Sequence, residues 1–594
     1  MQAIPRPEHP RPQLKREPWI NLNGTWSYEI DHTDSGYDQA EYATAGVGAR
    51  GESDHRSRRL WLSQGFEQKI TVPFCPESSL SGVGHTDFIE VMWYHRPITR
   101  PLDWKERVWL HFGAVDYHCE VFLGGQLVGR HAGGQCGFSV DITGVINPGQ
   151  TLDLVLRVTD YLRRYTQPSG KQSTWHHSRG CHYTRVTGIW QTVWMESVPF
   201  AGLESIHIVP DLDQSAFYLT PHFHTPRPGH HLRATLLEKA KPVAEVTVPQ
   251  VNGIPLTLSV AEPRLWSPES PFLYDLRLEV LDEHEHVVDT VHSYAGLRKI
   301  HWEEDRLFLN NQPLYLRLVL DQGYYPDGIW TAPSDEALRQ DIELAMAAGF
   351  NGARLHQKVF EPRFHYWADR LGYLTWGESS SWGCNASSFE GRDNFLREWR
   401  EIICRDRNHP SIIAWTPWNE MWWIQDELQF GRTLLDTYAL TRALDPTRPV
   451  HTASGGAHCR TDIWSVHSYA QTAEALAEAI NNRCDNNLKA ARKKLLESTD
   501  YAGQPYLLTE FGGVKWHNRS DETSNPAWGY GDAPKTEEEF LHRLKALVDC
   551  IHAHPQLSGF CYTQLTDVEQ ETNGLYTYDR QPKFDMTLIK RIFD

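Results

Sequence analysis

The sequence lacks several features that would place it in other classes of protein. It has no run of about 18 apolar residues, so it predicts no transmembrane helix. Its first 26 residues contain no apolar segment of the kind found in secretory signals. Positive charge is in deficit, and the formal net charge of −18 argues against nucleic-acid or anionic-membrane partners. Its ten cysteines form no C-x-x-C pair, and we expect free thiols in a cytoplasmic protein.

Cofactor motifs are also missing. There is no G-x-x-x-x-G-K-[ST] loop, no strand-linked G-x-G-x-x-G and no G-x-S-x-G elbow. The 30 histidines invite a search for metal ligands. His222-Phe-His224 has the H-x-H spacing of metal-dependent barrel hydrolases, but it falls outside the region predicted to form a barrel. His176, His177 and His182 have no carboxylate or cysteine at ligand spacing. We therefore expect no cofactor and no metal.

The length of 594 residues predicts about three domains. Short β-type runs broken by Gly, Pro, Asn and Asp predict an antiparallel β-sandwich over residues 1–199. A second all-β stretch, 200–297, has the length of an immunoglobulin-like sandwich. Residues 298–594 alternate between strand and helix patterns, with eight predicted strands, which is typical of a parallel (β/α)8 TIM barrel.

Two carboxylates follow predicted barrel strands. The fourth strand ends at Asn419-Glu420 and the seventh at Thr509-Glu510. Active sites of this fold lie at the carboxyl ends of the strands, so both side chains should meet at one mouth. A single Glu in such a place is usually a salt-bridged loop residue, but two on opposite strands favour glycoside hydrolysis with retention. In that reaction one carboxylate is the nucleophile and the other is the acid/base.

Other side chains at strand ends are candidates for the same pocket. Arg354 and His356 follow strand two, and an ion pair at the barrel mouth is the alternative for Arg354. Tyr469 follows strand six, where it could hold the nucleophile ionised or be an ordinary loop aromatic. Tyr562, at the end of strand eight, could support the sugar or pack in the barrel core. The 23 tryptophans are most often core residues, but four could wall the pocket: Trp175, Trp382, Trp422 and Trp516.

The chain resembles glycoside hydrolase family 2, which includes β-galactosidases, β-glucuronidases and β-mannosidases. Six motifs carry the resemblance, in the family's order: Asn21–Trp26, Val186–Trp190, Asn311–Arg317, Gly349–Arg354, the segment ending at Glu420, and Thr509–Gly512. The resemblance implies a sugar-binding jelly-roll, an immunoglobulin-like sandwich and a catalytic barrel. It implies Glu420 as the acid/base, Glu510 as the nucleophile, and Arg354, Asn419 and Tyr469 in the sugar subsite.

Departures from the family's motifs bear on the sugar. Where family β-glucuronidases carry an N-x-K that pairs with the sugar carboxylate, this chain reads Glu571-Thr572-Asn573. An acidic residue there should repel a uronate. At the position of an Asp of the large β-galactosidases stands His182, and the galactosidases' magnesium motif lacks its partners near Glu378. The long insertions 167–183 and 516–534 predict a walled pocket and therefore exo action.

The sequence thus predicts a retaining exo-β-glycosidase that takes a neutral β-linked sugar from an oligosaccharide or glycoside, with β-galactosidase as the default. The alternatives are a β-glucuronidase or galacturonidase, another specificity of the same family, a metal-dependent barrel hydrolase, and a carbohydrate-binding protein without activity. Association into a homo-oligomer through the sandwich domains stays open.

Overall fold

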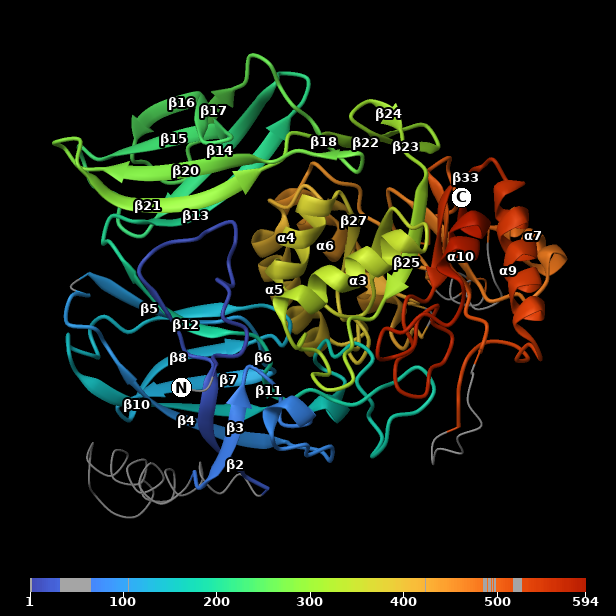
Figure 1. Ribbon diagram of the computed structural model, residues 1–594, viewed down its shortest axis with the longest axis horizontal. Helices are drawn as coiled ribbons and strands as arrows, with labels where there is room; N and C mark the ends of the chain where they lie inside the picture. Colours follow the sequence, from blue (N-terminus) through green and yellow to red (C-terminus); the bar gives the residue numbers. More distant parts are fainter. Residues whose placement is uncertain are drawn as a thin grey trace.

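The computed structural model describes residues 3–32, 66–104, 106–421, 423–483, 489, 493, 495, 498–516 and 526–594. Within them, two β-sandwiches precede a parallel β/α barrel, as the sequence predicted. Figure 1 shows the two sandwiches stacked on one side of the barrel. The boundaries predicted near residues 199 and 297 stay predictions. No helix in the described ranges is long and apolar enough to span a bilayer.

The first sandwich pairs a four-stranded sheet, β1-β12-β5-β9, with a six-stranded sheet, β3-β2-β4-β10-β7-β8. Apolar side chains between the sheets form its core, including Trp26, Tyr94 and Leu156. Its strands are β1 (Trp19–Asn21), β2 (Gly24–Ile30), β3 (Gln68–Val72), β4 (Val91–Thr99), β5 (Arg107–Phe112), β6 (Val115–Asp116), β7 (His118–Leu123), β8 (Gln126–Ala132), β9 (Phe138–Asp141), β10 (Thr151–Thr159), β11 (Gly188–Ile189) and β12 (Val193–Val198), with 3-10 turns η1 (Ser79–Ser81) and η2 (Leu162–Arg164).

The second sandwich packs the sheet β13-β14-β17 on the sheet β16-β15-β20-β21, and its core includes Phe217, Leu236 and Leu278. Its strands are β13 (Leu203–Asp211), β14 (Ala216–Phe223), β15 (His231–Glu238), β16 (Lys241–Pro249), β17 (Leu256–Ser259), β18 (Trp266–Ser267), β19 (Ser270–Pro271), β20 (Tyr274–Leu281) and β21 (Val287–Ala295).

Seven barrel strands form one parallel sheet in the order β28-β27-β26-β25-β33-β32-β31. Between β28 and β31, Val450 forms a parallel bridge to Trp415, and β30 pairs with β29. Pro417 lies between these two contacts and has no N–H to donate, so the ladder is interrupted there. The strands of this region are β22 (Ile300–Glu303), β23 (Arg306–Leu309), β24 (Gln312–Pro313), β25 (Leu316–Asp321), β26 (Gly352–Leu355), β27 (Leu374–Glu378), β28 (Ile412–Thr416), β29 (Trp418–Asn419), β30 (Ala453–Ser454), β31 (Trp464–Ser468), β32 (Tyr506–Gly512) and β33 (Leu557–Thr563).

Helices connect the barrel strands on the outside. The helix α3 begins after Ser334, because the side chain of that residue caps it by accepting from the Ala337 N–H. The described helices are α3 (Asp335–Ala347), α4 (Pro362–Leu371), α5 (Phe389–Asp406), α6 (Glu427–Leu444), α7 (Ala473–Asn482), α9 (Glu537–His552) and α10 (Met586–Phe593).

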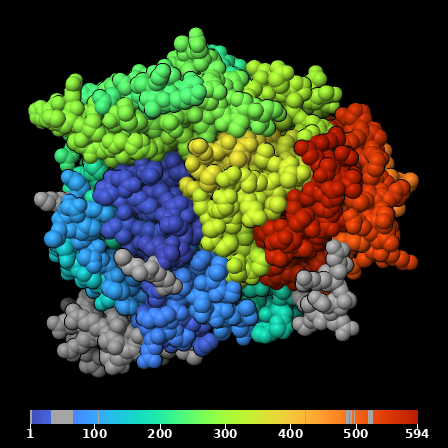
Figure 2. Space-filling model, viewed as in Figure 1, coloured from blue at the N-terminus to red at the C-terminus, as the bar shows by residue number. Residues whose placement is uncertain are grey.

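The N-terminal arm, residues 3–18, connects the two sandwiches and the barrel. Figure 2 shows this dark-blue segment covering the junction between both sandwiches and the yellow part of the barrel. Arg16 donates to Asp289 of β21 at 2.9 Å and to Glu196 of β12 at 3.4 Å. Arg6 donates to Glu361, just before α4, at 2.7 Å. These buried charges are paired, so the arm holds the sandwiches in a fixed place beside the barrel.

A loop of the first sandwich, residues 165–187 between η2 and β11, extends over the mouth of the barrel. Ser169 N–H donates to the Trp382 carbonyl at 2.9 Å, and Gly170 N–H donates to the Ser380 carbonyl at 3.0 Å. A Cβ on Gly170 would lie 2.1 Å from the Gln357 carbonyl oxygen, and its φ is +60°, so this close approach requires glycine. The loop therefore brings side chains of the first sandwich to the carboxyl ends of the barrel strands.

Candidate active site

Glu420 and Glu510 meet at this mouth. Glu510 lies in β32, and Glu420 directly follows β29 with a left-handed backbone φ of +50°. Such a φ costs a non-glycine residue about 1–2 kcal/mol and is typical of active sites. One carboxylate oxygen of each, together with a nitrogen of His467, lies within a mutual distance of 4.8 Å. This short separation fits retention, because inverting enzymes hold their carboxyls about 6.5–9.5 Å apart.

The surroundings of Glu510 hold its carboxylate ionised. Burial alone would raise its pKa, but the positive charges of His467 and Arg354 outweigh burial and lower the pKa to about 2. Arg354 Nη1 donates to Glu510 Oε1 at 2.8 Å, and the Tyr469 hydroxyl donates to Oε2 at 2.5 Å. An ionised, hydrogen-bonded carboxylate is the state that a nucleophile requires.

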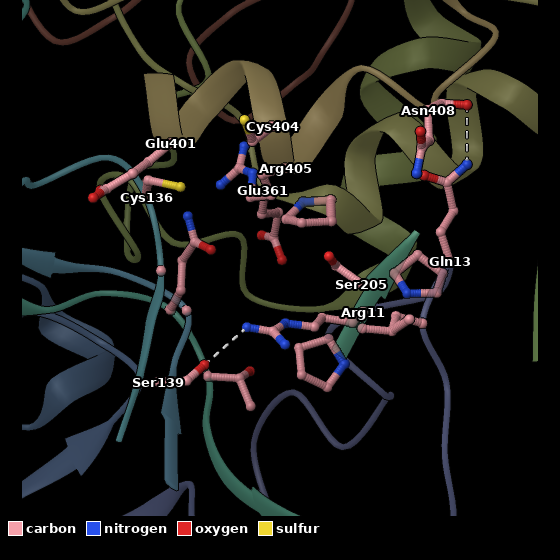
Figure 3. Close-up of a pocket in the computed structure, with 18 of the residues that line it drawn as sticks. Arg11, Gln13, Cys136, Ser139, Ser205, Glu361, Glu401, Cys404, Arg405 and Asn408 are labelled. Carbon is pink, nitrogen blue, oxygen red and sulfur yellow. Dashed lines mark hydrogen bonds between the residues drawn. The ribbon is translucent and has the colours of Figure 1, made fainter. Parts of the chain in front are cut away.

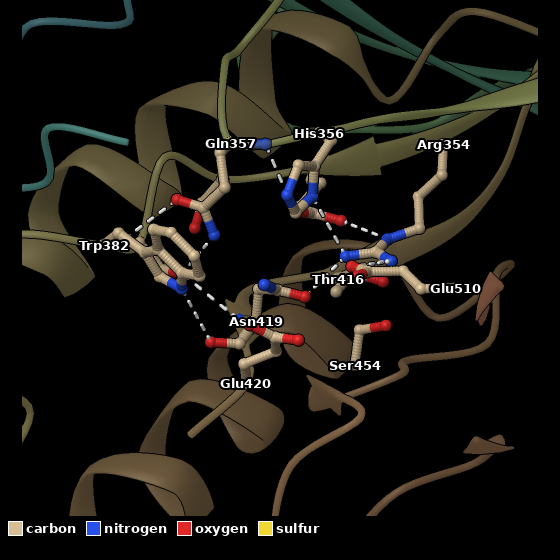
Figure 4. Close-up of polar contacts among 12 residues, drawn as sticks. Arg354, His356, Gln357, Trp382, Thr416, Asn419, Glu420, Ser454 and Glu510 are labelled. Carbon is tan, nitrogen blue, oxygen red and sulfur yellow. Dashed lines mark hydrogen bonds and ion pairs between the residues drawn. The ribbon is translucent and has the colours of Figure 1, made fainter. Parts of the chain in front are cut away.

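Arg354 contacts Glu378, Glu510 and Asn419 at the base of the site (Figure 4). Its side chain is fully buried, and its Nε donates to Glu378 Oε2 at 2.6 Å. Its Nη2 donates to Asn419 Oδ1 at 2.6 Å, which fixes the residue next to Glu420. His356 Nδ1 lies 2.9 Å from Glu378 Oε1. Four of the predicted site residues, Arg354, His356, Asn419 and Tyr469, are thus brought together with the two carboxylates.

Glu420 has the opposite electrostatic tendency. Burial raises its pKa, the negative charge of Glu510 raises it further, and His467 opposes both. His467 Nδ1 lies 2.8 Å from Glu420 Oε1. A carboxyl of raised pKa beside one of lowered pKa is the arrangement that general acid catalysis needs.

Sequence reasoning missed His467. Its Nδ1 also lies 3.3 Å from Glu510 Oε2, and its Nε2 lies 2.9 Å from the Ser454 hydroxyl, which donates to Thr509 at 3.0 Å. A signal was available, because side chains two apart on a strand share a face. His467 stands two residues before Tyr469, which was selected.

The walls of the mouth come from two parts of the chain. The rings of His182, in the sandwich loop, and Trp382, after β27, stack at 5.5 Å between centroids. Trp382 Nε1 donates to the Asn419 carbonyl at 3.3 Å. Burial lowers the pKa of His182 to about 4, and the positive charge of Lys171 adds to this effect. Predicted residue His182 therefore lies at the rim of the carboxylate cluster in its neutral form.

Two other predicted residues lie elsewhere. Tyr562 packs among Phe511, Phe593 and the rest of the apolar core outside the strands. Trp516 packs its ring near Phe540 and Phe584, at centroid distances of 5.9 and 6.0 Å. These contacts are apolar packing, so the structure gives neither residue the sugar-binding place expected of it. Of the other candidate walls, Trp175 is 57% exposed, and Trp422 lies outside the described residues.

Glu571 belongs to a buried polar network beside the site. It accepts from the Tyr183 hydroxyl and, at 2.9 Å, from Asn573 Nδ2. Gln322 Nε2 donates to the Tyr183 oxygen at 3.1 Å and to Gln564 Oε1 at 2.9 Å. Gln564 closes the ring by donating to Asn573 at 2.7 Å. Both Glu571 oxygens are therefore engaged within the protein.

The cluster of Glu420, His467 and Glu510 has ligand atoms that a divalent metal could use. Its electrostatics disfavour such an ion, because the Arg354 guanidinium already lies 2.8 Å from Glu510. The Tyr469 hydroxyl also donates to the second oxygen of Glu510, so both of its oxygens are already engaged. The donor set therefore fits two organic carboxylates in acid–base partnership better than a metal site.

A separate cavity of about 410 Å³ lies between the N-terminal arm, the first sandwich and α5 (Figure 3). Arg11 reaches into it and donates to Ser139 at 3.3 Å. Its charged lining residues include Glu361, which binds Arg6, and Arg405, which binds Asp406. None of the predicted site residues lines this cavity.

A β/α barrel whose mouth holds two adjacent carboxylates of opposed pKa defines a glycoside hydrolase. Comparison with known families agrees. Residues 300–594 match "Glycosyl hydrolases family 2, TIM barrel domain", and residues 203–298 match "Glycosyl hydrolases family 2". The chain belongs to glycosyl hydrolase family 2.

Individual relatives carry two kinds of name. A β-glucuronidase of Paenibacillus borealis is 26% identical over 591 residues, covering 91% of this chain and 94% of its own. A β-galactosidase of Vibrio vulnificus is 23% identical over 476 residues, covering 75% of this chain. The chain spans only 43% of that β-galactosidase and 50% of a longer Formosa agariphila relative.

Solved structures show the same fold. The β-glucuronidase of Ruminococcus gnavus in complex with D-glucuronic acid has a TM-score of 0.78 at 20% identity, covering 99% of this chain and 100% of its own. The β-D-glucuronidase of Dictyoglomus thermophilum has a TM-score of 0.76 at 19% identity, and the match covers 98% of each chain.

Proposed function

We propose that the protein is a retaining exo-β-glycosidase with Glu510 as the nucleophile and Glu420 as the acid/base. The observation that carries this proposal is a pair of adjacent carboxylates at the barrel mouth whose surroundings shift their pKa values in opposite directions. The pKa of Glu510 is lowered to about 2, whereas that of Glu420 is raised. At the pH of the cytoplasm expected from the sequence, one is ready to attack carbon and the other is biased toward holding a proton.

The reaction proceeds in two displacements. Glu510 attacks the anomeric carbon while Glu420 gives its proton to the departing glycosidic oxygen, which yields a glycosyl ester on Glu510. Ester formation removes the negative charge that raises the Glu420 pKa, so this pKa falls and Glu420 stays ionised, the state in which it can accept a proton. It then takes a proton from a water molecule while the oxygen of that water attacks the anomeric carbon from the side that the aglycone left. Glu510 departs as a carboxylate, and the product keeps the β configuration.

For the sugar, we propose a β-hexuronide, with β-glucuronide first. This reverses the neutral preference expected from Glu571 and Asn573. Support comes from the β-glucuronidases of P. borealis, R. gnavus and D. thermophilum. It also comes from Glu571, whose oxygens are held by Tyr183 and Asn573 and do not stand free in the pocket. Exo action is supported by the sandwich loop that covers the mouth.

A neutral β-galactoside is the second candidate. The residual charge of Glu571 favours it, since a buried carboxylate disfavours a second one nearby. The V. vulnificus β-galactosidase relative adds support.

The test is to trap the intermediate. A 2-deoxy-2-fluoro β-glycosyl fluoride is the reagent. Its fluorine at carbon 2 destabilises the positively charged transition states of both steps, but the good fluoride leaving group keeps the first step fast. The ester on Glu510 therefore forms and then hydrolyses slowly. We expect the protein mass to rise by one fluoroglycosyl group, located on the peptide containing Glu510. Glu510→Gln, with nearly the same shape and no charge, should gain no mass. Labelling of another residue, or an α-configured first product by NMR, would overturn the mechanism.

A further inference from the structure

Lys171 is a mostly buried lysine at the mouth of the barrel. Lys171 is 6% exposed, and its Nζ lies 5.5 Å from the centroid of the Trp382 ring and 5.9 Å from that of the Tyr183 ring. Among the residues that the structure describes, none forms an ion pair or a hydrogen bond with its Nζ, and this atom is not one of those shielded from solvent. The side chain is therefore mostly buried while its ammonium stays accessible and has no carboxylate of its own, so it can bind an anionic partner.

The two rings that the ammonium contacts link it to the acid/base and to Glu571. The Lys171 carbonyl accepts from the Tyr183 N–H at 2.8 Å, and the Tyr183 hydroxyl binds Glu571. On the other side, Trp382 binds the carbonyl of Asn419. The charge of Lys171 lowers the pKa of Glu420 and of Glu571, in each case against the larger effect of burial. Lys171 is therefore close enough to both Glu420 and Glu571 to act on their charges.

Two other cationic side chains near the mouth cannot take this role. Arg185 donates to the carbonyls of Ser173 and Trp175, and also to those of Thr86 and His176, so its guanidinium is already engaged. His182 is neutral near pH 7, because burial lowers its pKa to about 4. Glu571 does not pair with Lys171 directly, since its oxygens are held by Tyr183 and Asn573.

We propose that Lys171 binds the carboxylate of the sugar. The inference rests on the proposed hexuronide specificity and deepens it. Family β-glucuronidases supply a lysine where this chain has Asn573. In this chain the positive charge comes instead from Lys171, on the loop of the first sandwich next to Gly170. A carboxylate at carbon 6 of the sugar would then satisfy the ammonium only when substrate is bound. A sugar with a hydroxymethyl group there would leave that charge unpaired.

The experiment compares two substrates that differ only at carbon 6: 4-nitrophenyl β-D-glucuronide and 4-nitrophenyl β-D-glucoside. kcat/KM is measured for the full chain and for Lys171→Met, Lys171→Arg and Arg179→Met, each at its own pH optimum. Arg179 is an exposed cation of the same loop and serves as the matched control. We expect Lys171→Met to lower the glucuronide-to-glucoside ratio by about 10–100-fold, as for loss of a charged hydrogen bond. Lys171→Arg should keep part of the ratio, and Arg179→Met should keep all of it.

The outcomes separate two failures. If the unmodified protein cleaves the glucuronide and Lys171→Met keeps the ratio, the role of Lys171 is overturned and the proposed function stands. An equal fall on both substrates also overturns it, because Lys171 would then act through Glu420 or through folding, which melting curves distinguish. If the unmodified protein prefers the glucoside, the hexuronide proposal itself fails. A 4-nitrophenyl β-D-galacturonide arm tests whether the carboxylate alone suffices for recognition.

Discussion

The Nδ1 atom of His467 lies 2.8 Å from Oε1 of Glu420. The same nitrogen is 3.3 Å from Oε2 of Glu510, so one imidazole contacts both carboxylates. Its charge lowers the pKa of each of them. His467 therefore helps to keep the nucleophile ionised, but it opposes the factors that keep the acid protonated.

Replacing His467 with Gln tests this double effect. Activity requires Glu510 ionised and Glu420 protonated, so the acid limb of kcat/KM follows Glu510 and the basic limb follows Glu420. Removing a charge that lowers both pKa values should move both limbs to higher pH. His222→Gln, on an exposed position of β14, should leave the profile in place. A profile of His467→Gln that only loses height, without moving, would reduce His467 to a packing role.

Tyr469 offers a second test at the nucleophile. Its hydroxyl donates to Glu510 at 2.5 Å, and its ring stacks on Tyr530 at 3.4 Å. Tyr469→Phe should lower kcat by about 10–100-fold, the usual cost of losing a hydrogen bond to a charged group. The acid limb should move to higher pH, because that bond lowers the Glu510 pKa. Tyr530→Phe removes a neighbouring hydroxyl and should leave both quantities nearly unchanged.

Local patterns predicted the fold because each element carries its own signals. Ser334 caps the start of α3 and Thr536 caps that of α9, and in each case the side chain accepts a hydrogen bond from the first turn. Strand-end position also selected Arg354 and Tyr469, because the barrel gathers strand ends into one place. The roles of these residues stay predictions.

Tyr562 shows where periodicity stops helping. All seven residues of β33 are buried, so alternation of polar and apolar residues cannot tell the inside of the barrel from the helix side. Cys561 faces the barrel core, while Tyr562 packs outward near Phe593 of α10. Trp516 and Lys171 depend on contacts with residues far away in the chain, Phe584 and Trp382, which no local pattern reveals.

Chelation should leave activity unchanged. Glu420, His467 and Glu510 have the composition of a metal site, but Arg354 neutralises Glu510 and hydrogen bonds occupy the oxygens. We expect exhaustive dialysis against EDTA to preserve kcat/KM within error, and metal analysis of the dialysed protein to find less than one ion per chain. Loss of activity restored by one divalent metal would instead support the metal-dependent class of hydrolase.

Azide can assign the two carboxylates separately. In Glu420→Ala the glycosyl ester still forms on Glu510, most readily with a 4-nitrophenol leaving group that needs little protonation. Its breakdown lacks a base, and general acid–base help of this kind contributes about 10²–10⁴-fold. Azide needs no deprotonation and fits the space left by the carboxylate. It should attack from the face that the aglycone left, which restores the rate and yields a β-glycosyl azide.

In Glu510→Ala azide would replace the nucleophile itself. It would attack from the opposite face and yield the α-glycosyl azide in a single displacement. The anomeric coupling constant of the product in the NMR spectrum distinguishes the two cases. We expect β azide from Glu420→Ala and α azide from Glu510→Ala. The reverse pattern would exchange the two roles, and it would contradict the electrostatics that lower the Glu510 pKa to about 2 and raise that of Glu420.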